Sequence, residues 1–144
     1  FMKLCGTSMA NIEEMLGLCT IFVSGREGYY EMTGEKDCRK AMKIVQEKYH
    51  IKEGVICTAG ADGAMWYDGN ERESPAYSIV PVDTTGAGDC FLGGLLYAYF
   101  VQHQNKTSAM TFANASAAVK CLQAGPRSKA DVETITKFKD CHNL

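Results

Sequence analysis

The stretch at residues 82–96 constrains the fold of this chain more than any other, and it reads Val-Asp-Thr-Thr-Gly-Ala-Gly-Asp-Cys-Phe-Leu-Gly-Gly-Leu-Leu. Residues 79–82 have the apolar character of a strand. After the turn, the spacing predicts a helix whose apolar face is Phe91, Leu92, Leu95, Leu96 and Tyr99. A Gly-Ala-Gly turn at a helix start exposes backbone N–H groups that have no acceptor within the helix. Together with the helix dipole, these groups favour binding of an anion.

Asp89 is the unusual residue of this stretch, because a carboxylate beside an anion site repels a bound phosphate. Its presence is explained if it accepts the proton of an attacking hydroxyl while the amides stabilise a phosphoryl group in transfer. Asp89 therefore predicts phosphoryl transfer. The alternative is that Asp89 only stabilises the start of the helix, where acidic residues are favoured without any catalytic role.

Composition narrows the class of protein. The 144 residues suffice for one domain with its own core, and 46% of them are hydrophobic and 22% charged. A net charge of −2 argues against a nucleic-acid partner, and no apolar run approaches the ~20 residues of a membrane span. Seven cysteines without a Cys-x-x-Cys pair argue against a disulfide framework or a zinc site. We therefore expect a cytoplasmic protein.

Helical and strand patterns alternate along the chain. They predict helices at 8–18, 27–33, 36–49, 89–104 and 107–122 and a last helix opened by 128–131. They predict strands at 20–23, 54–58, 64–68 and 71–80. This alternation favours an α/β fold with a mostly parallel, doubly wound sheet and an antiparallel hairpin at 64–80. Ligands of such sheets bind beyond the carboxyl ends of the strands. The loops expected to line one cleft there are 24–27, 58–63 and 83–89.

Local signals place several helix ends and faces. Thr107 is the expected N-cap of its helix, and residues 128–131 resemble a capping box that opens the last helix. The inward residues are expected to be Ile12, Met15 and Leu16 in the first helix and Val132, Ile135 and Phe138 in the last.

The run from Val82 to Leu96 resembles the C-terminal signature of the ribokinase-like, phosphofructokinase-B family of carbohydrate kinases. The resemblance covers most of the chain from Ile21 onward and implies a three-layer α/β/α fold. Members of this family are much longer than this chain. The resemblance thus implies that 1–144 is a single domain, the C-terminal nucleotide-binding half, and that the N-terminal substrate and lid part is absent. By itself the chain is then expected to be incomplete for activity.

The resemblance assigns catalytic roles to the turn. Asp89 corresponds to the catalytic base, and Gly86, Ala87 and Gly88 to the other catalytic residues of the turn. The amides of Ala87, Gly88 and Asp89 correspond to the anion hole. The implied reaction transfers the γ-phosphoryl group of ATP, with Mg²⁺, to the hydroxyl of a sugar or a sugar-like molecule.

Two further segments are implied to bind the nucleotide. Thr58, Gly60 and Gly63 match a Thr-x-Gly-x-x-Gly segment that contacts the phosphates, although a glycine turn after a strand is common without any ligand. Asn114 lies on a helix that walls the adenine pocket in the family, and Gly125 follows that helix. The alternative for Asn114 is a solvent-facing helix residue.

The cation sites are also implied by the resemblance. Glu27 follows a strand and opens a helix. The family glutamate that acts on magnesium through water and phosphate has the same position. Asn11 and Glu14 match the Asn-x-x-Glu motif of that glutamate, but they fall within a helix that precedes the strand. The backbone carbonyls of Asp83 and Thr85 correspond to ligands of a monovalent cation such as K⁺. The partner segment of that cation site, 123–128, is one residue shorter than usual.

Two other functions stay open at this point. One is a non-catalytic nucleotide-binding or regulatory module, and the other is a kinase of a vitamin precursor from the same superfamily, whose members often have a cysteine near the loop. Cys90 adjoins Asp89 instead of replacing a glycine of the loop. The expected partners are ATP, a small sugar-like substrate and the missing N-terminal half, and a homodimer is compatible with the sequence. The identity of the sugar is not encoded here.

Overall fold

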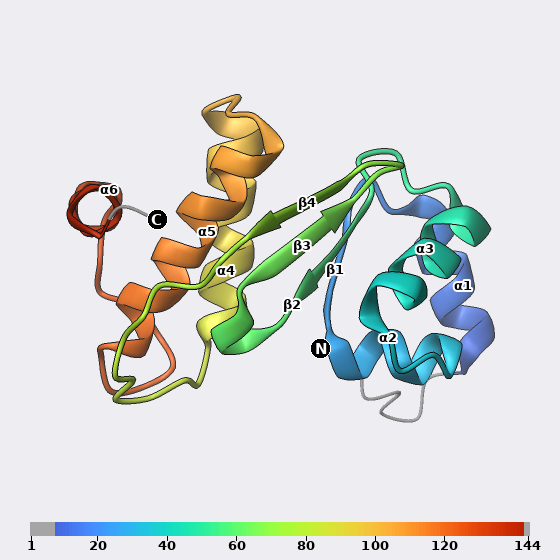
Figure 1. Ribbon diagram of the computed structural model, residues 1–144, viewed down its shortest axis with the longest axis horizontal. Helices are drawn as coiled ribbons and strands as arrows, with labels where there is room; N and C mark the ends of the chain where they lie inside the picture. Colours follow the sequence, from blue (N-terminus) through green and yellow to red (C-terminus); the bar gives the residue numbers. More distant parts are fainter. Residues whose placement is uncertain (1–7, 143–144) are drawn as a thin grey trace. The chain divides into compact units, whose positions relative to one another are not determined.

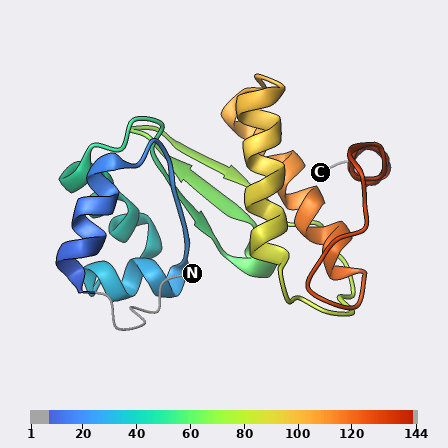
Figure 2. The ribbon, with the colours of Figure 1, turned by 180° about the vertical axis from the view of Figure 1, so that it is seen from behind.

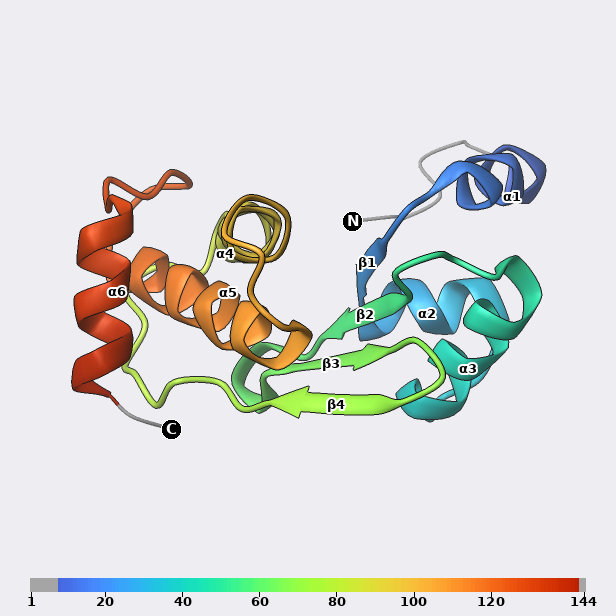
Figure 3. The ribbon, with the colours of Figure 1, turned by 90° about the horizontal axis from the view of Figure 1, so that it is seen from above.

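Four short strands form one sheet in the computed structural model, which describes residues 8–142. They lie in the order β1-β2-β3-β4, and their bounds are Phe22–Gly25, Val55–Thr58, Ala64–Tyr67 and Glu71–Ser74. β1 and β2 are parallel, with Phe22 opposite Val55 and Gly25 opposite Thr58. β3 and β4 run in opposite directions as a hairpin (Figure 3). The prediction of an α/β fold with parallel and antiparallel elements is confirmed.

The chain divides into two units by its internal contacts. Among the described residues, the first unit consists of residues 8–59 with 65–72, and the second consists of residues 60–64 with 73–142. Within residues 8–142, no helix combines the length and the apolar character needed to cross a bilayer.

Three helices belong to the first unit: α1 (Met9–Leu18), α2 (Arg26–Thr33) and α3 (Cys38–Tyr49) (Figure 1). α2 packs against α3, and both contact β2. The core of this unit is made of residues with helical or strand spacing, among them Ile12, Leu16, Tyr29, Ala41, Met42, Val45, Val55 and Cys57. Ala41, Met42 and Val45 have the i, i+1, i+4 spacing of one helix face, and this face of α3 is buried.

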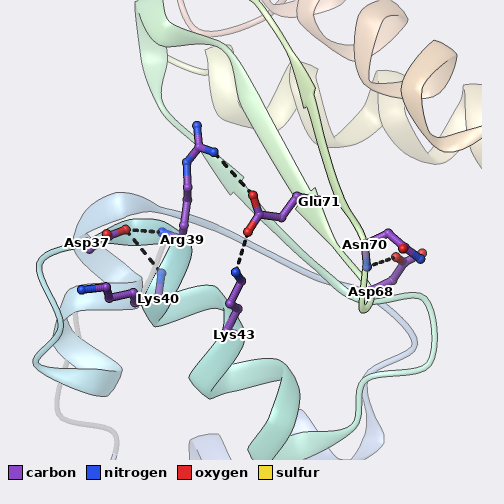
Figure 4. Close-up of polar contacts among 7 residues, drawn as sticks. All are labelled: Asp37, Arg39, Lys40, Lys43, Asp68, Asn70 and Glu71. Carbon is purple, nitrogen blue, oxygen red and sulfur yellow. Dashed lines mark hydrogen bonds and ion pairs between the residues drawn. The ribbon is translucent and has the colours of Figure 1, made fainter.

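Charged side chains of α3 and of the β3–β4 hairpin pair with one another (Figure 4). Glu71 accepts from Lys43 Nζ at 2.7 Å and from Arg39 Nη1 at 3.4 Å. In the hairpin turn, Asp68 accepts the backbone N–H of Asn70 at 3.1 Å. The side chains of Glu71 and of its two partners are between 39% and 54% exposed, so these ion pairs lie at the surface.

The second unit is built on two helices that lie side by side, α4 (Ala87–Leu96) and α5 (Lys106–Cys121) (Figures 1 and 2). α4 continues into a π-helical turn, η2 (Tyr97–Val101), and α6 (Val132–Cys141) packs on α5. A short 3₁₀ turn, η1 (Gly60–Asp62), precedes β3. A Cβ at Gly94 of α4 would lie 2.9 Å from the Cβ of Ser116 on α5. Gly94 of the sequence signature thus lets these two helices approach closely, whereas a Cβ at Gly93 would meet nothing within 4 Å.

The expected strand beyond Ser74 is wrong, because β4 ends there and residues 75–82 have no regular structure. Pro75 and Pro81 lack the N–H group that a sheet ladder requires. Val80 and Val82 are 87% and 66% exposed, and the N–H of Val82 donates to the carbonyl of Cys121. Apolar character alone misled the prediction, since no neighbouring strand is available to this segment within the described sheet.

The expected N-cap residues of the last two helices are wrong as well. Asn105 caps α5 in place of Thr107, because its Oδ1 accepts the N–H of Ser108 at 2.9 Å. Asp131 caps α6 in place of Ser128 by accepting the N–H of Thr134 at 2.8 Å. Asparagine and aspartate are among the strongest N-caps.

Helix faces are narrower than predicted. On α4 the buried residues are Phe91, Gly94 and Leu95, whereas Leu92 and Leu96 are 37% and 39% exposed. The helix ends at Val101 and not near Gln104, because η2 closes with a bond from the N–H of Gln102 to the carbonyl of Tyr97. Met15 and Val132 are also exposed, contrary to expectation.

Candidate functional site

Asp83 is at the centre of the loop that precedes α4. Its Oδ1 accepts the N–H of Thr85 at 2.9 Å, and its Oδ2 accepts the N–H of Gly125 at 2.9 Å. Its own N–H donates to the carbonyl of Cys121 at 3.2 Å. These bonds, above all those from Thr85, lower the pKa of the Asp83 carboxyl to about 2. The loop is therefore held against the end of α5 and the segment that follows it.

Gly86 begins α4 as its N-cap in the left-handed conformation, with φ of +80°. A Cβ there would collide with the carbonyl oxygen of Pro126. Glycine is thus required by both the backbone angle and the close approach of the 123–128 segment. Because glycine has no side chain, no side-chain cap covers the first N–H groups of α4.

The amides of the turn differ in how they are used. The N–H of Ala87 donates to the carbonyl of Thr84 at 3.1 Å, which closes the turn. Within the described chain, the N–H groups of Gly88 and Asp89 have no acceptor. These two amides are consequently the ones available to an anion, while the Ala87 amide serves the turn itself.

Asp89 lies in the first turn of α4 and is exposed. Its carboxylate has no hydrogen-bond partner among residues 8–142. Gly86 occupies the N-cap position of α4, so the Asp89 side chain does not cap the helix. What remains is either a favourable charge near the helix N-terminus or a group that acts on a substrate.

Lys120, near the end of α5, was not singled out by sequence reasoning, and it is the only charged residue with no exposed surface among those described. Its Nζ donates to the carbonyl oxygen of Asp83 at 2.7 Å and to that of Gln123 at 3.4 Å. A signal was present in the sequence: Lys120 interrupts the apolar run Ala118, Val119, Cys121, where a surface lysine is not expected.

Asn114 is buried, so its solvent-facing alternative is wrong. Its Nδ2 lies 3.0 Å from the carbonyl oxygens of Ser74 and Pro75 and from the hydroxyl of Ser74. The amide therefore holds the irregular chain that leaves β4, and this partner could not be found from sequence because it is 40 residues away.

The loop after β2 contains the other expected phosphate contacts. Thr58 is the last residue of β2 and is partly exposed, and Gly60 has open space around its Cα. A Cβ at Gly63 would collide with the carbonyl of Ser74. Glycine at 63 is thus explained by chain packing in the second unit, whereas glycine at 60 is favoured by its φ of +58° alone.

Glu27 lies in the first turn of α2, directly after β1, as the sequence context predicted. It is exposed, and no residue of the described chain pairs with it. Asn11 and Glu14 lie within α1, before β1. Among residues 8–142, no three His, Cys, Asp or Glu side chains gather as a metal site.

The second unit brings together Asp83, Thr85, the 86–89 turn and Gly125 in one loop cluster. Glu27 and Thr58 belong to the first unit. The single cleft expected for loops 24–27, 58–63 and 83–89 stays a prediction.

Solved structures define the class of protein. A fructokinase from Vibrio cholerae O395, solved with fructose, ADP and calcium ion bound, matches with a TM-score of 0.80 and 26% identity over 90% of this chain and 44% of that chain. A double mutant of that fructokinase was solved with potassium ion bound. An aminoimidazole riboside kinase from Salmonella enterica, solved with aminoimidazole riboside and an ATP analog, has a TM-score of 0.77 and 25% identity over 92% and 47% of the two chains. The fold is ribokinase-like.

Sequence comparison then gives the family. The model of the pfkB family carbohydrate kinases matches residues 3–133, and the chain belongs to this family. A cytidine kinase from Thermococcus kodakarensis is 40% identical over 82 residues, which are 55% of this chain and 28% of that protein. The chain spans less than half the length of each of these relatives.

Proposed function

We propose that this chain is the nucleotide-binding part of a kinase that transfers the γ-phosphoryl group of ATP to a hydroxyl of a sugar-like molecule. The observation that carries the proposal is the start of α4, where the Gly88 and Asp89 amides have no acceptor in the described chain and adjoin an exposed, unpaired carboxylate. Amides alone would suit any anion. An unpaired carboxylate in the same turn can accept the proton of a hydroxyl that attacks the bound anion.

In the proposed reaction, Asp89 accepts the proton of the substrate hydroxyl as its oxygen attacks the γ-phosphorus. The bond from that phosphorus to the β,γ-bridging oxygen breaks, and ADP leaves. The Gly88 and Asp89 amides stabilise the charge on the transferring group. Thr58, Gly60, Gly125 and the region of Asn114 are proposed to hold the nucleotide, in line with the ligands named for the fructokinase and riboside kinase structures.

Mg²⁺ is the proposed metal, and the residues present fit its usual mode of binding. Magnesium is held by one or two carboxylates together with substrate phosphates and water, so it needs no cluster of protein ligands. Glu27 offers an exposed carboxylate with no partner in the described chain. Mg²⁺ would neutralise phosphate charge when bound. A cytoplasmic location and a homodimer stay predictions.

The test is the variant Asp89→Asn, which has nearly the same shape but cannot accept a proton at neutral pH. Phosphoryl transfer to a panel of sugars is measured on the longest natural form of the protein that contains these residues. We expect turnover to fall by about 10²–10⁴-fold, with ATP affinity kept or increased because a negative charge is removed. The melting temperature should barely change, since Asp89 has no hydrogen bond within the described chain.

Asp140→Asn is the matched control, because it removes an exposed charge from α6. A variant Asp89→Asn that keeps most of its turnover would leave Asp89 as a first-turn acid only. ATP binding by the unaltered protein without transfer to any sugar would favour the non-catalytic module.

A further inference from the structure

The buried ammonium of Lys120 is the feature of the second unit that the proposed reaction leaves unexplained. It lies in the last turn of α5, has no exposed surface, and donates to two main-chain carbonyls, those of Asp83 and Gln123. No carboxylate of the described chain forms an ion pair with it. A buried charge is costly unless its partners compensate it, so a lysine used only for packing would be poorly suited here.

The two carbonyls show what the charge does. The Asp83 carbonyl begins the loop that leads into α4, and the Gln123 carbonyl begins the segment that packs on this loop. The ammonium thus lies between two stretches of irregular backbone and compensates the partial negative charge of both. This is the task that a bound monovalent cation performs when it is held by main-chain oxygens.

A K⁺ ion on the carbonyls of Asp83 and Thr85 does not fit this arrangement. The Asp83 oxygen already accepts from an ammonium at 2.7 Å, and a second positive charge at the same oxygen would be repelled. On the same loop, the N–H of Gly125 donates to the Asp83 carboxylate, and Pro126 packs against Gly86.

We propose that the Lys120 ammonium is a built-in cation that replaces a monovalent metal ion at the loop preceding α4. Lys120 is then a positioning residue: it acts through Asp83 on the 86–89 turn and does not touch substrate. An effect of Lys120 on phosphate binding at the 86–89 turn rests on the proposed function. The stabilisation of the loop by Lys120 does not rest on it.

The test compares melting temperatures of the longest natural form of the protein that contains these residues, in matched concentrations of KCl, NaCl and choline chloride. The unaltered chain should melt at the same temperature in all three salts. Lys120→Ala should melt lower in choline chloride and regain about 2–4 °C specifically in KCl, because an ion can enter the vacated space. Lys120→Met, which keeps most of the side-chain volume without the charge, should be destabilised without this recovery. Lys137→Ala, which removes an exposed lysine, is the surface control.

Specific stabilisation of the unaltered chain by KCl would overturn the proposal, because the ion would then bind beside Lys120. A folded Lys120→Ala that melts equally in all three salts would also overturn it. If this variant folds in KCl but not in choline chloride, the result supports the proposal, and failure to fold in either salt counts against it. ATP affinity in the same salts should vary less than about twofold for the unaltered chain. A failure to bind ATP at all would contradict the proposed function and leave the melting result valid.

Discussion

The two units of the chain compensate their charged groups in different ways. In the first unit, carboxylates pair with side-chain cations at the surface: Glu71 with Lys43 and Arg39 (Figure 4), and Glu13 with Lys48 at 2.6 Å. The second unit also has surface pairs, such as Glu133 with Lys137 at 2.6 Å. In addition, its Asp83 carboxylate accepts backbone N–H groups, and its buried Lys120 ammonium and Asn114 amide donate to backbone carbonyls.

The difference follows from how much irregular backbone each unit contains. In the first unit, the buried side chains that donate to backbone carbonyls, such as those of Tyr29 and Trp66, are uncharged. Its charged side chains pair at the surface, where a pair contributes little. The second unit contains long irregular segments, 75–86 and 122–131, whose backbone groups need partners. Buried side chains supply those partners. Changes to polar residues should therefore matter more in the second unit than in the first.

The largest effect on stability is expected at Asn114. In Asn114→Asp, an ionised carboxylate cannot donate to the three oxygens of Ser74 and Pro75 and is repelled by them, so the free energy of unfolding should fall by ~2–4 kcal/mol. The loss should shrink as the pH falls toward the ordinary pKa range of aspartate, because the protonated side chain regains a donor. Urea unfolding at several pH values measures this.

Asn105→Asp is the matched control, since the exposed N-cap of α5 accepts a hydrogen bond that aspartate accepts equally well. Its unfolding free energy should stay within about 0.5 kcal/mol of the original. Equal effects of the two substitutions would contradict the role assigned to the buried amide.

The next effect is expected from Gly86→Ala, which should lower the free energy of unfolding by ~1–3 kcal/mol because alanine is strained at this positive φ and its Cβ meets Pro126. Gly88→Ala, two residues along in the same turn, has nothing within 4 Å of the new Cβ and should be neutral or slightly stabilising. Thermal unfolding of both variants decides the matter, and similar losses at the two positions would show that the close approach of Pro126 is not limiting.

A salt titration sharpens the comparison between carboxylates. Hydrogen bonds from backbone N–H groups lower the pKa of Asp83. The hydrogen bond from Lys43 lowers the pKa of Glu71. A lowered pKa stabilises the folded state above the ordinary pKa, and this contribution is lost as the pH falls through the folded pKa, near pH 2 for Asp83. High salt should raise the pKa of Glu71 toward its usual value and leave that of Asp83 almost unchanged.

Carbon-detected NMR of the carboxyl groups follows both pKa values in one sample. If salt raised both pKa values equally, charged side chains screened by salt, and not the Thr85 and Gly125 amides, would be the cause of the lowered Asp83 pKa.

The smallest effect is expected from Glu71→Gln in the first unit. Removing this surface carboxylate breaks its ion pairs with Lys43 and Arg39, yet the melting temperature should change by less than about 2 °C. Differential scanning calorimetry measures the shift. A loss of stability as large as that of Asn114→Asp would contradict the proposed difference between the two units.

Local signals in the sequence determined much of the architecture and the start of the candidate site. The Gly-Ala-Gly-Asp turn, the end of α2 at Gly34 and the buried stripe of α3 each depend on residues a few positions apart, whose backbone preferences and spacing act without the rest of the chain. For the same reason the sequence placed Asp89 and Glu27 in first helical turns correctly.

Tertiary structure alone decided which groups hold that site in place. Lys120 meets Asp83 across 37 residues, Asn114 meets Ser74 across 40, and Gly125 meets Asp83 across 42. No local preference encodes such a bond, because each of these side chains could equally face solvent until packing removes water and leaves a backbone group in need of a partner. The exposed strand expected at 79–82 failed for the same reason, since a strand exists only where another strand lies beside it.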